Sequence, residues 1–352
     1  MSLPPASTES DETAILDAVR AGDAEAFAAI TERYRRQLQV HCYRMLGSLD
    51  DAEDLVQETM LRAWRGRLRF EGRSLFRTWL YRIATNLCLN ALERAPRRLL
   101  PPDVAPPVTA DTDTSDVPSE PPSRPELPWL QPYPDRLLEL TAPPETEPDA
   151  IAISRETIEL AFLAALQHLP PRQRAVLVLH DVLGWSAKEA GALLELTVAA
   201  VNSALQRGRS TMRTRLPAGR QDWASLSPRT EEERSVLERF MDAWEQADAG
   251  LLTALMHDDA RWAMPPAPLW FDGRAAIARM FELFPIGWQG DFRMLPTGAN
   301  GQPAAAAYLR RTCQSEYRLV SINVLRIESG KIAEVTTFAP TLCRAFNLPS
   351  TL

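Results

Sequence analysis

Hydrophobic residues recur at intervals of three and four through most of residues 11–95, which is the spacing of one face of an α-helix. The pattern stops at Gly47-Ser48 and resumes from Leu49 to Trp64. After a basic stretch it returns from Leu75 to about Arg94. The first part of the chain is therefore predicted to be a bundle of helices.

Residues 98–150 differ in composition from the helical segments, because they contain nearly half of the 29 prolines of the chain. A segment of this composition buries too little apolar surface to fold alone, so we expect it to be extended or disordered. Trp129-Leu130-Gln131-Pro132-Tyr133-Pro134 is an apolar island within it. The island either docks on another part of the protein or is a scatter of apolar residues in a flexible tether.

The helical pattern resumes from Ile151 to about Leu216, and a further helix is predicted from Thr230. Alternating apolar and polar residues at Ala304–Arg311 and Arg318–Ile327 then predict antiparallel strands, with Ser329-Gly330 as a turn. The predicted fold class is multidomain, with two all-α domains and a third domain of α+β type. We place the domains at residues 11–97, 151–217 and 228–345, with 98–150 as a linker.

A length of 352 residues agrees with two or three domains. The net charge of −7 argues against a nucleic-acid-binding protein, but residues 99–150 hold 11 acidic and only two basic residues. The remainder of the chain is close to +2, with arginines gathered at 62–98 and 207–220. Local clusters of charge decide electrostatic binding, so a nucleic-acid partner stays possible.

The four cysteines show no metal-binding or disulfide spacing, so we expect buried thiols and no metal or other cofactor. His41 beside Cys42 is better explained by packing than by metal ligation. The sequence has no signal peptide and no apolar run of membrane length. A cytoplasmic location is the expectation.

Two stripes run along the predicted helix 49–64. One is apolar and is expected to be buried, and the other combines acidic and amide groups with a leucine. The second stripe suits a basic partner helix, although for a lone helix a solvated polar face is the simpler explanation. Its members are Asp50, Asp54, Gln57, Glu58 and Leu61.

The following loop and helix supply groups that suit unstacked single-stranded DNA. Arginines in the loop can hold phosphates, helical amides can contact base edges, and nearby aromatic rings can stack. Phe76 and Trp79 are either a wedge between bases or part of the core, and we favour the core. The polar candidates are Arg73, Ser74, Arg82, Asn86 and Asn90.

A helix-turn-helix is predicted at Ser186–Arg213. Ser186 and Glu189 have the spacing of a capping box, and Thr197 can cap the second helix. Such modules place the start of the second helix in the major groove of DNA, where amides read base edges and arginines hold phosphates. The candidates are Thr197, Asn202, Ser203, Gln206, Arg207 and Arg209.

Asp51–Trp64, Phe70–Ser74 and Phe76–Asn86 together resemble the second conserved domain of the sigma-70 family, and the helix-turn-helix resembles its fourth domain. The order and the spacer are those of the extracytoplasmic-function group. The resemblance implies that Asp54, Gln57, Glu58 and Leu61 bind the clamp-helix coiled coil of the largest subunit of core RNA polymerase. It also implies that Arg73–Asn90 holds the promoter minus-ten strand and that 197–209 reads the minus-thirty-five duplex. Ala204 departs from the arginine that many members carry there.

The third domain resembles the SnoaL-like fold, a curved sheet wrapped by helices into a cone, which in some sigma factors acts in cis. A cone of this kind has an apolar pocket that could hold a small apolar ligand. Its possible lining residues are Met264, Trp270, Phe271, Trp288, Tyr308, Ile322 and Phe338. His257, Asp258, Asp259 and Asp272 are the nearby acid–base candidates, and the first three are expected to cap a turn rather than to catalyse.

The sequence therefore predicts a non-catalytic RNA polymerase sigma factor that directs promoter-specific initiation and is regulated by its own third domain. Two alternatives stay open. The third domain could be a small-molecule isomerase, cyclase or ligand sensor fused to a sigma factor. The chain could also be a classical repressor or activator, but that leaves Asp51–Asn86 without a role.

Overall fold

The computed structural model describes residues 17–70, 75–94, 96–117, 123–139, 158–216, 231–286 and 290–352. The chain divides into two compact units. Unit 1 consists of Met1–Pro96 and His168–Thr214, and unit 2 of Arg97–Gln167 and Arg215–Leu352. No helix among the described residues is long and apolar enough to cross a membrane.

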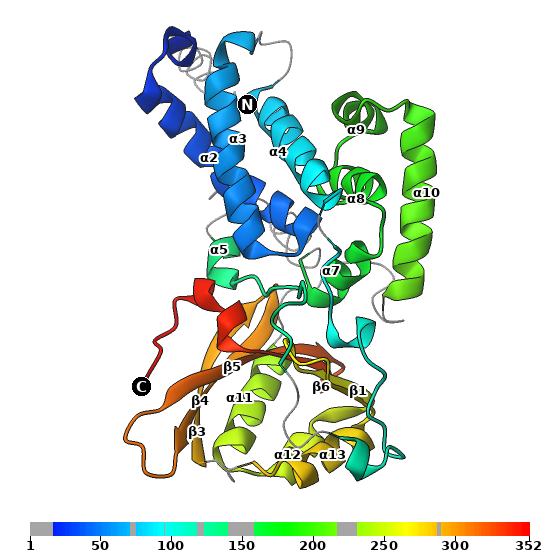
Figure 1. Cartoon of the computed structure of the whole chain (residues 1–352), viewed down its shortest axis with the longest axis vertical. Helices are drawn as coiled ribbons and strands as arrows, with labels where there is room; N and C mark the ends of the chain where they lie inside the picture. Colours follow the sequence, from blue (N-terminus) through cyan, green and yellow to red (C-terminus); the bar gives the residue numbers. More distant parts are fainter. Residues whose placement is uncertain are drawn as a thin grey trace, which may run out of the picture. The chain divides into compact units, whose positions relative to one another are not determined.

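Unit 1 begins with a bundle of three helices, shown in blue to cyan in Figure 1. Asp23 caps the first helix with its carboxylate, Gly47 ends it with a left-handed backbone, and Ser48 caps the second helix. Short sequence signals therefore set the boundary between these two helices. The helices are α2 (Ala24–Leu46), α3 (Leu49–Gly66) and α4 (Phe76–Leu92), with a 3-10 turn η1 (Arg67–Arg69) after α3.

The second part of unit 1 is the predicted helix-turn-helix. The capping box is confirmed, since Ser186 Oγ accepts from the Glu189 amide while the Glu189 carboxylate accepts from the Ser186 amide. Gly191 permits the tight turn, because a Cβ there would lie 2.7 Å from the Leu196 carbonyl oxygen. The elements are α8 (Pro171–Leu177), a π-helical turn η4 (Val178–Val182), α9 (Ala187–Leu194) and α10 (Val198–Arg215).

Unit 2 contains a six-stranded sheet in the order β2-β1-β6-β5-β4-β3, in which β1 and β6 are parallel and the other pairs antiparallel. The predicted antiparallel strands at Ala304–Arg311 and Arg318–Ile327 and the Ser329-Gly330 turn are confirmed. The strands are β1 (Met256–Ala263), β2 (Trp270–Asp272), β3 (Gly290–Ala299), β4 (Gln302–Arg311), β5 (Arg318–Glu328) and β6 (Lys331–Phe338). The helices are α11 (Glu231–Glu245), α12 (Ala249–Ala254) and α13 (Arg274–Leu283).

Helices α11, α12 and α13 pack on one face of this sheet (Figure 1). Phe240 and Ile277 from the helices meet Trp262, Leu325 and Val335 from the strands in one apolar core. Successive residues of a strand point to opposite faces, so the neighbours of these strand residues belong to the other face. The two faces are therefore distinct environments, and only one of them is covered by α11, α12 and α13.

The proline-rich linker is largely part of unit 2, and the expectation that it cannot pack was wrong. Trp129, Leu130 and Tyr133 are at most 2% exposed, which confirms that the apolar island docks. Val108 bonds to the edge of the sheet, donating to the Trp270 carbonyl and accepting from the Asp272 amide. The linker elements are η2 (Pro101–Asp103), η3 (Thr114–Asp116) and α5 (Asp135–Glu139), and α7 (Leu160–Gln167) follows them.

The C-terminal segment also belongs to unit 2. It includes the 3-10 turns η6 (Pro340–Leu342) and η7 (Arg344–Phe346). Beyond them the main chain of Ser350 and Leu352 bonds to Leu319 and Tyr317. The hydroxyl of Tyr308 donates to the Pro349 carbonyl. The tail thereby covers part of the sheet face that points away from the helices.

Candidate protein and nucleic-acid interfaces

The outer face of α3 combines acidic groups with an exposed leucine. Asp54 and Gln57 are exposed, and Leu61 keeps 50% of its surface open. Glu58 is half-buried and forms an ion pair of 2.6 Å with Arg62 one turn later. The opposite stripe, including Val56 and Met60, is buried as predicted. An exposed leucine amid acids is a surface that suits a helix carrying basic and apolar residues.

One stripe of α4 is polar and exposed. It consists of Arg82, Asn86 and Asn90, one turn apart. Arg73 and Ser74, the other two candidates of this set, lie outside the described residues. Phe76 is buried, and its ring packs against those of Phe70 and Trp79 with centroid distances of 5.6 and 5.7 Å, so the aromatic residues belong to the core here.

The polar stripe of α4 faces the helix-turn-helix within unit 1. Arg82 donates a hydrogen bond of 2.9 Å to the Ala192 carbonyl near the end of α9. The rings of Tyr81 and Trp185 lie 5.6 Å apart. Between α4 and the start of α8 there is a cavity of about 550 Å³. It is lined by Asn86, Leu89, Asn90, Glu93, Pro170, Pro171 and Arg172.

Arg174 of α8 is buried where α8 meets the end of α2. Its guanidinium donates to the Met45 carbonyl at the end of α2 and to the Leu169 carbonyl. Burial lowers the pKa of Arg174 to about 10, so the side chain keeps its charge. Cys88 is nearby, and the hydrogen bond with Cys42, together with burial, raises the pKa of the Cys88 thiol. Arg174 was not among the sequence-predicted residues, since nothing in the pattern distinguishes a buried arginine from an exposed one.

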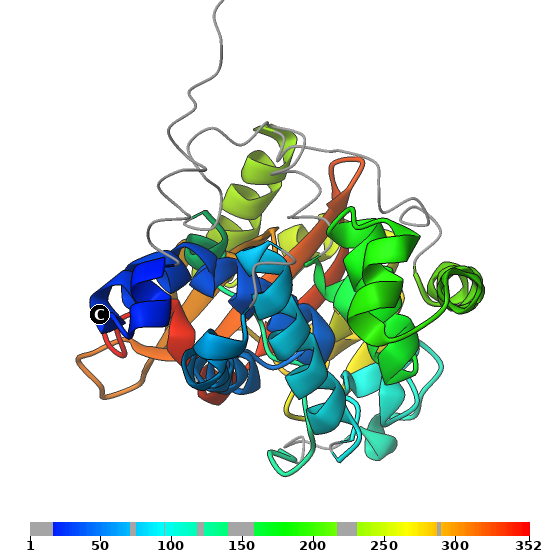
Figure 2. The same ribbon diagram turned by 90° about the horizontal axis from the view of Figure 1, so that it is seen from above.

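Helix α10 presents a continuous polar face. Asn202, Ser203, Gln206 and Arg207 are exposed, and Figure 2 shows the helix end-on, apart from α2, α3 and α4. Thr197 Oγ1 accepts from the Ala200 amide, so this residue serves as a cap. These positions are free to meet a DNA groove.

Arg209 differs from the other candidates on α10. Its guanidinium makes two bonds, of 2.5 and 2.9 Å, to the carboxylate of Asp181. That ion pair raises the pKa of Arg209 and ties α10 to η4. Ala204 is 7% exposed, so the departure from the family pattern falls at a position that is buried here.

The predicted pocket of the third domain requires correction. Phe271 belongs to the core between sheet and helices, and Met264 packs against that core. Trp270, Tyr308, Ile322 and Phe338 point to the opposite face, because each alternates with a neighbour that faces the helices. Trp288 lies outside the described residues. Both faces of this sheet are apolar, so composition alone assigned these four side chains to the wrong face.

The helix-covered core is filled with aromatic rings and a short polar chain. Trp244 lies within 6.2 Å of the ring of Trp262, with Phe281 and Phe292 beside it. The indole N–H of Trp262 donates a hydrogen bond of 2.9 Å to the Thr337 hydroxyl. That hydroxyl in turn donates a hydrogen bond of 2.7 Å to the side-chain oxygen of Asn323. These groups orient one another but include no acid or base.

The four acid–base candidates lie away from this core. His257 bonds to the Glu328 carbonyl, Asp258 is paired with Arg274, and Asp259 is exposed. Asp272 is on the opposite face of the sheet, 3.1 Å from Arg261. None of the four is positioned to transfer a proton inside the cone.

His41 is a buried neutral group of α2. Its ring accepts or donates a hydrogen bond of 2.9 Å with the Thr85 hydroxyl on α4. Burial, helped by the charge of Arg44, lowers the pKa of His41 to about 3. Within the described part of the chain, no three His, Cys, Asp or Glu side chains gather to hold a metal ion.

Comparison with known proteins identifies three family models along the chain. Sigma-70 region 2 matches residues 30–98, sigma-70 region 4 matches 159–212, and the SnoaL-like domain matches 237–335. The ECF RNA polymerase sigma factor SigG of Mycobacterium tuberculosis is 43% identical over 335 residues, which cover 95% of this chain and 86% of that protein. The chain belongs to the ECF family of RNA polymerase sigma factors.

A further relative of this sigma factor matches a shorter part of the chain. The ECF sigma factor SigW of Bacillus subtilis is 32% identical over 199 residues, covering 56% of this chain and 92% of that protein. The crystal structure of the M. tuberculosis ECF sigma factor SigJ has the same overall fold, with a TM-score of 0.58. It is 21% identical, and the match covers 92% of this chain and all of the other.

The sigma factor also contains long-range hydrogen bonds that the sequence patterns did not reveal. The Asn300-Gly301 dipeptide, just before the predicted strand at Ala304–Arg311, is a known turn signal and could have been found. Its side-chain partners could not, since they lie far away in the sequence. The same holds for the bond from Arg82 to Ala192, where the acceptor is a main-chain carbonyl that any residue type would provide.

Proposed function

We propose that the outer face of α3 is the surface by which this sigma factor binds the clamp-helix coiled coil of core RNA polymerase. The contact would involve Asp54, Gln57, Glu58 and Leu61. Its support is the exposure of an acidic and leucine-bearing face in the region that matches sigma-70 region 2. The rest of α3 is committed to packing against α2 and α4.

A charge reversal tests this surface. Asp54→Lys with Glu58→Lys should abolish co-purification with core polymerase, because both carboxylates face outward and a basic partner would be repelled. Glu32→Lys, on the exposed side of α2, is the matched control and should co-purify normally. Retention of polymerase by the double variant would contradict the assignment.

The promoter contacts follow from the same placement. The minus-ten strand is assigned to Arg82, Asn86 and Asn90 on α4, together with Arg73 and Ser74 in the preceding loop. The minus-thirty-five duplex is assigned to the face of α10 that carries Asn202, Ser203, Gln206 and Arg207, with Thr197 at its start. Arg209 serves chiefly to hold α10 against η4, since Asp181 occupies its guanidinium.

The third domain regulates the two sigma regions in cis by holding the linker between them. The observation that carries this proposal is the burial of Trp129, Leu130 and Tyr133 within unit 2. A linker folded into the third domain is withheld from polymerase, whereas a sigma factor engaged at two promoter elements needs its linker to span them. The placement of the four acid–base candidates favours this non-catalytic role over an isomerase or cyclase.

Deletion of residues 225–352 tests the regulatory role. Transcription in vitro with purified core polymerase should change, and binding of the truncated chain to core polymerase serves as the check that regions 2 and 4 remain folded. If the truncated chain binds polymerase normally and transcribes every promoter as the full chain does, the third domain has no regulatory role.

A further inference from the structure

Asn300 occupies an unusual position for a turn residue. It lies between β3 and β4 with φ of 56°, followed by Gly301 with φ of 72°. Two successive left-handed residues form the tight hairpin turn that asparagine-glycine pairs favour. Turn residues are normally at the surface, yet Asn300 is 0% exposed. A buried amide needs partners, and here they come from outside the hairpin.

Asn300 binds two segments that are distant from each other in the sequence. Its side-chain oxygen accepts a hydrogen bond from the main-chain amide of Tyr133 at 2.8 Å. Its main-chain amide donates to the Tyr133 carbonyl, also at 2.8 Å. Its side-chain nitrogen donates to the Ile158 carbonyl, also at 2.8 Å. One residue therefore binds the linker at Tyr133 and, at Ile158, the segment that leads into region 4.

The next two residues repeat this arrangement. The Gly301 amide donates to the Asp135 carboxylate at 2.7 Å, on the linker side. The side-chain oxygen of Gln302 accepts from the Leu160 amide at 3.0 Å, at the first residue of α7. Tyr133, Ile158 and Leu160 are all at most 3% exposed, so these bonds are shielded from water. Residues 300–302 thus bind main-chain groups of both segments.

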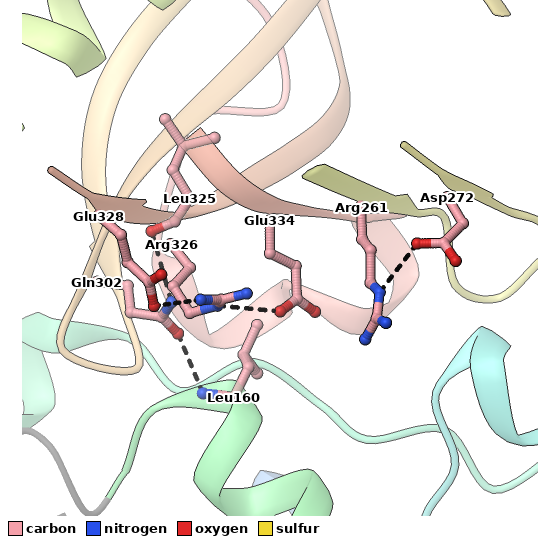
Figure 3. Close-up of polar contacts among 8 residues, drawn as sticks. All are labelled: Leu160, Arg261, Asp272, Gln302, Leu325, Arg326, Glu328 and Glu334. Atoms are coloured by element: carbon pink, nitrogen blue, oxygen red, sulfur yellow. Dashed lines mark hydrogen bonds and ion pairs between the residues drawn. The ribbon is translucent and has the colours of Figure 1, made fainter. Parts of the chain in front are cut away.

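Charged side chains on the surrounding sheet surface pair with one another. Arg326 lies between Glu328 and Glu334, and Arg261 is paired with Asp272 (Figure 3). Arg326, Glu334, Arg261 and Asp272 are cross-strand neighbours in register across four strands, so positive and negative side chains alternate. In Figure 3 this row lies on the side of the sheet where Gln302 meets Leu160. These charges pair with one another within the sheet, and the contacts to the two segments are the hydrogen bonds of residues 300–302 together with apolar packing.

We propose that residues 300–302 form a clasp, a binding site for the two chain segments 133–135 and 158–160, and that core polymerase opens it. The inference rests on the regulatory function proposed above and names the residues through which the third domain acts. Because Asn300 bonds to both segments, loss of its side chain weakens both attachments together. Apart from the Asp135 carboxylate, the groups that residues 300–302 bind in these segments are main-chain amides and carbonyls of this same chain.

Hydrogen exchange of the full-length protein tests whether the clasp holds both segments. Asn300→Gly keeps the left-handed turn, since glycine adopts positive φ without strain, but removes both side-chain bonds. Exchange of the Tyr133 and Leu160 amides should rise at least about ten-fold, as expected when a closing equilibrium loses more than one buried bond. Gln302→Met should raise exchange at Leu160 and leave Tyr133 protected.

Asn347→Gly is the matched control, because Asn347 also has positive φ but is exposed. It should leave both amides as in the wild type. If Asn300→Gly leaves Tyr133 and Leu160 as well protected as this control does, the clasp is contradicted.

A second arm adds core polymerase to the wild-type chain. The Tyr133 and Leu160 amides are expected to lose protection in the complex. Unchanged protection would overturn the proposal that core polymerase opens the clasp. Transcription by Asn300→Gly at limiting sigma factor separates this inference from the function that it deepens. If the amides lose protection but transcription equals the wild type, the clasp stands and the regulatory function fails.

Discussion

Arg82 on α4 donates a hydrogen bond to the Ala192 carbonyl on α9, at 2.9 Å. The same arginine belongs to the stripe that we assign to the promoter minus-ten strand. In this arrangement the helix-turn-helix therefore occupies a group that DNA would need. The acidic face of α3, which we propose as the polymerase surface, is exposed in the same unit and is not covered by this bond.

Arg82→Ala should weaken binding of a single-stranded minus-ten oligonucleotide by the polymerase complex. If Arg82 contacts one phosphate, the slope of log affinity against log salt concentration should fall by about 0.7, the contribution of one neutralised phosphate of a single strand. Arg94→Ala, exposed just beyond the end of α4, is the control. A salt slope unchanged from the wild type would exclude Arg82 from the DNA contact.

Arg174→Met should destabilise unit 1, because the Met45 and Leu169 carbonyls lose a charged, buried donor. The expected loss in the free energy of unfolding is about 1–3 kcal/mol, the usual cost of unsatisfied buried groups. Urea denaturation measures it. Arg172 is exposed, so the control substitution Arg172→Met should change the free energy of unfolding little. Equal effects of the two substitutions would argue against the buried contact of Arg174.

Ser186→Ala should lower stability by about 1 kcal/mol, the typical effect of losing an N-cap. The hydroxyl of Ser186 accepts from the Glu189 amide, and alanine leaves that amide without its cap. Ser210→Ala on the exposed face of α10 tests for a general effect of removing a serine hydroxyl. If the two variants have the same denaturant midpoint, the capping role of Ser186 is contradicted.

The sequence predicted those elements whose local pattern has one physical solution. The α3 helix follows from its buried stripe, and the capping box from the spacing of Ser186 and Glu189. The linker was mispredicted because composition measures what a segment can bury by itself. Trp129 and Tyr133 are buried instead within a unit that includes distant parts of the chain.

The pocket prediction failed for a related reason. In β4 every residue from Gln302 to Leu309 is buried, so burial shows no alternation between the two faces. Alternating strands normally show which side chains face the core, but here both sides are covered. Only the register of the sheet reveals that Tyr308 and Ile322 point away from the helices.

Substitutions on α10 should separate sequence reading from phosphate contact. Gln206→Ala should cost about 1–3 kcal/mol at a cognate minus-thirty-five site and relax the preference at one base pair. Arg207→Ala should instead weaken binding to all sequences and reduce the salt slope by about 1. Fluorescence anisotropy with cognate and scrambled duplexes distinguishes the two, and identical behaviour of both variants would refute the division of roles.

His41 should make the stability of unit 1 depend on pH. Its pKa is lowered to about 3 in the folded protein by burial, whereas in the unfolded chain it titrates near 6.5. Above pH 6.5 neither state binds the proton, so His41 adds no pH dependence there. Below pH 6.5 only the unfolded chain takes it up, and the free energy of unfolding falls by about 1.4 kcal/mol per pH unit until pH approaches 3.

His41→Gln tests this dependence, because glutamine offers Thr85 a hydrogen-bonding group but does not titrate. Between pH 7 and pH 5 the wild type should lose about 2 kcal/mol more than the variant, measured by urea unfolding at each pH. The carboxylates are the same in both proteins, so their contribution cancels in the difference. Parallel stability curves for the two proteins would mean that His41 is protonated in the folded state, contrary to its burial beside Arg44.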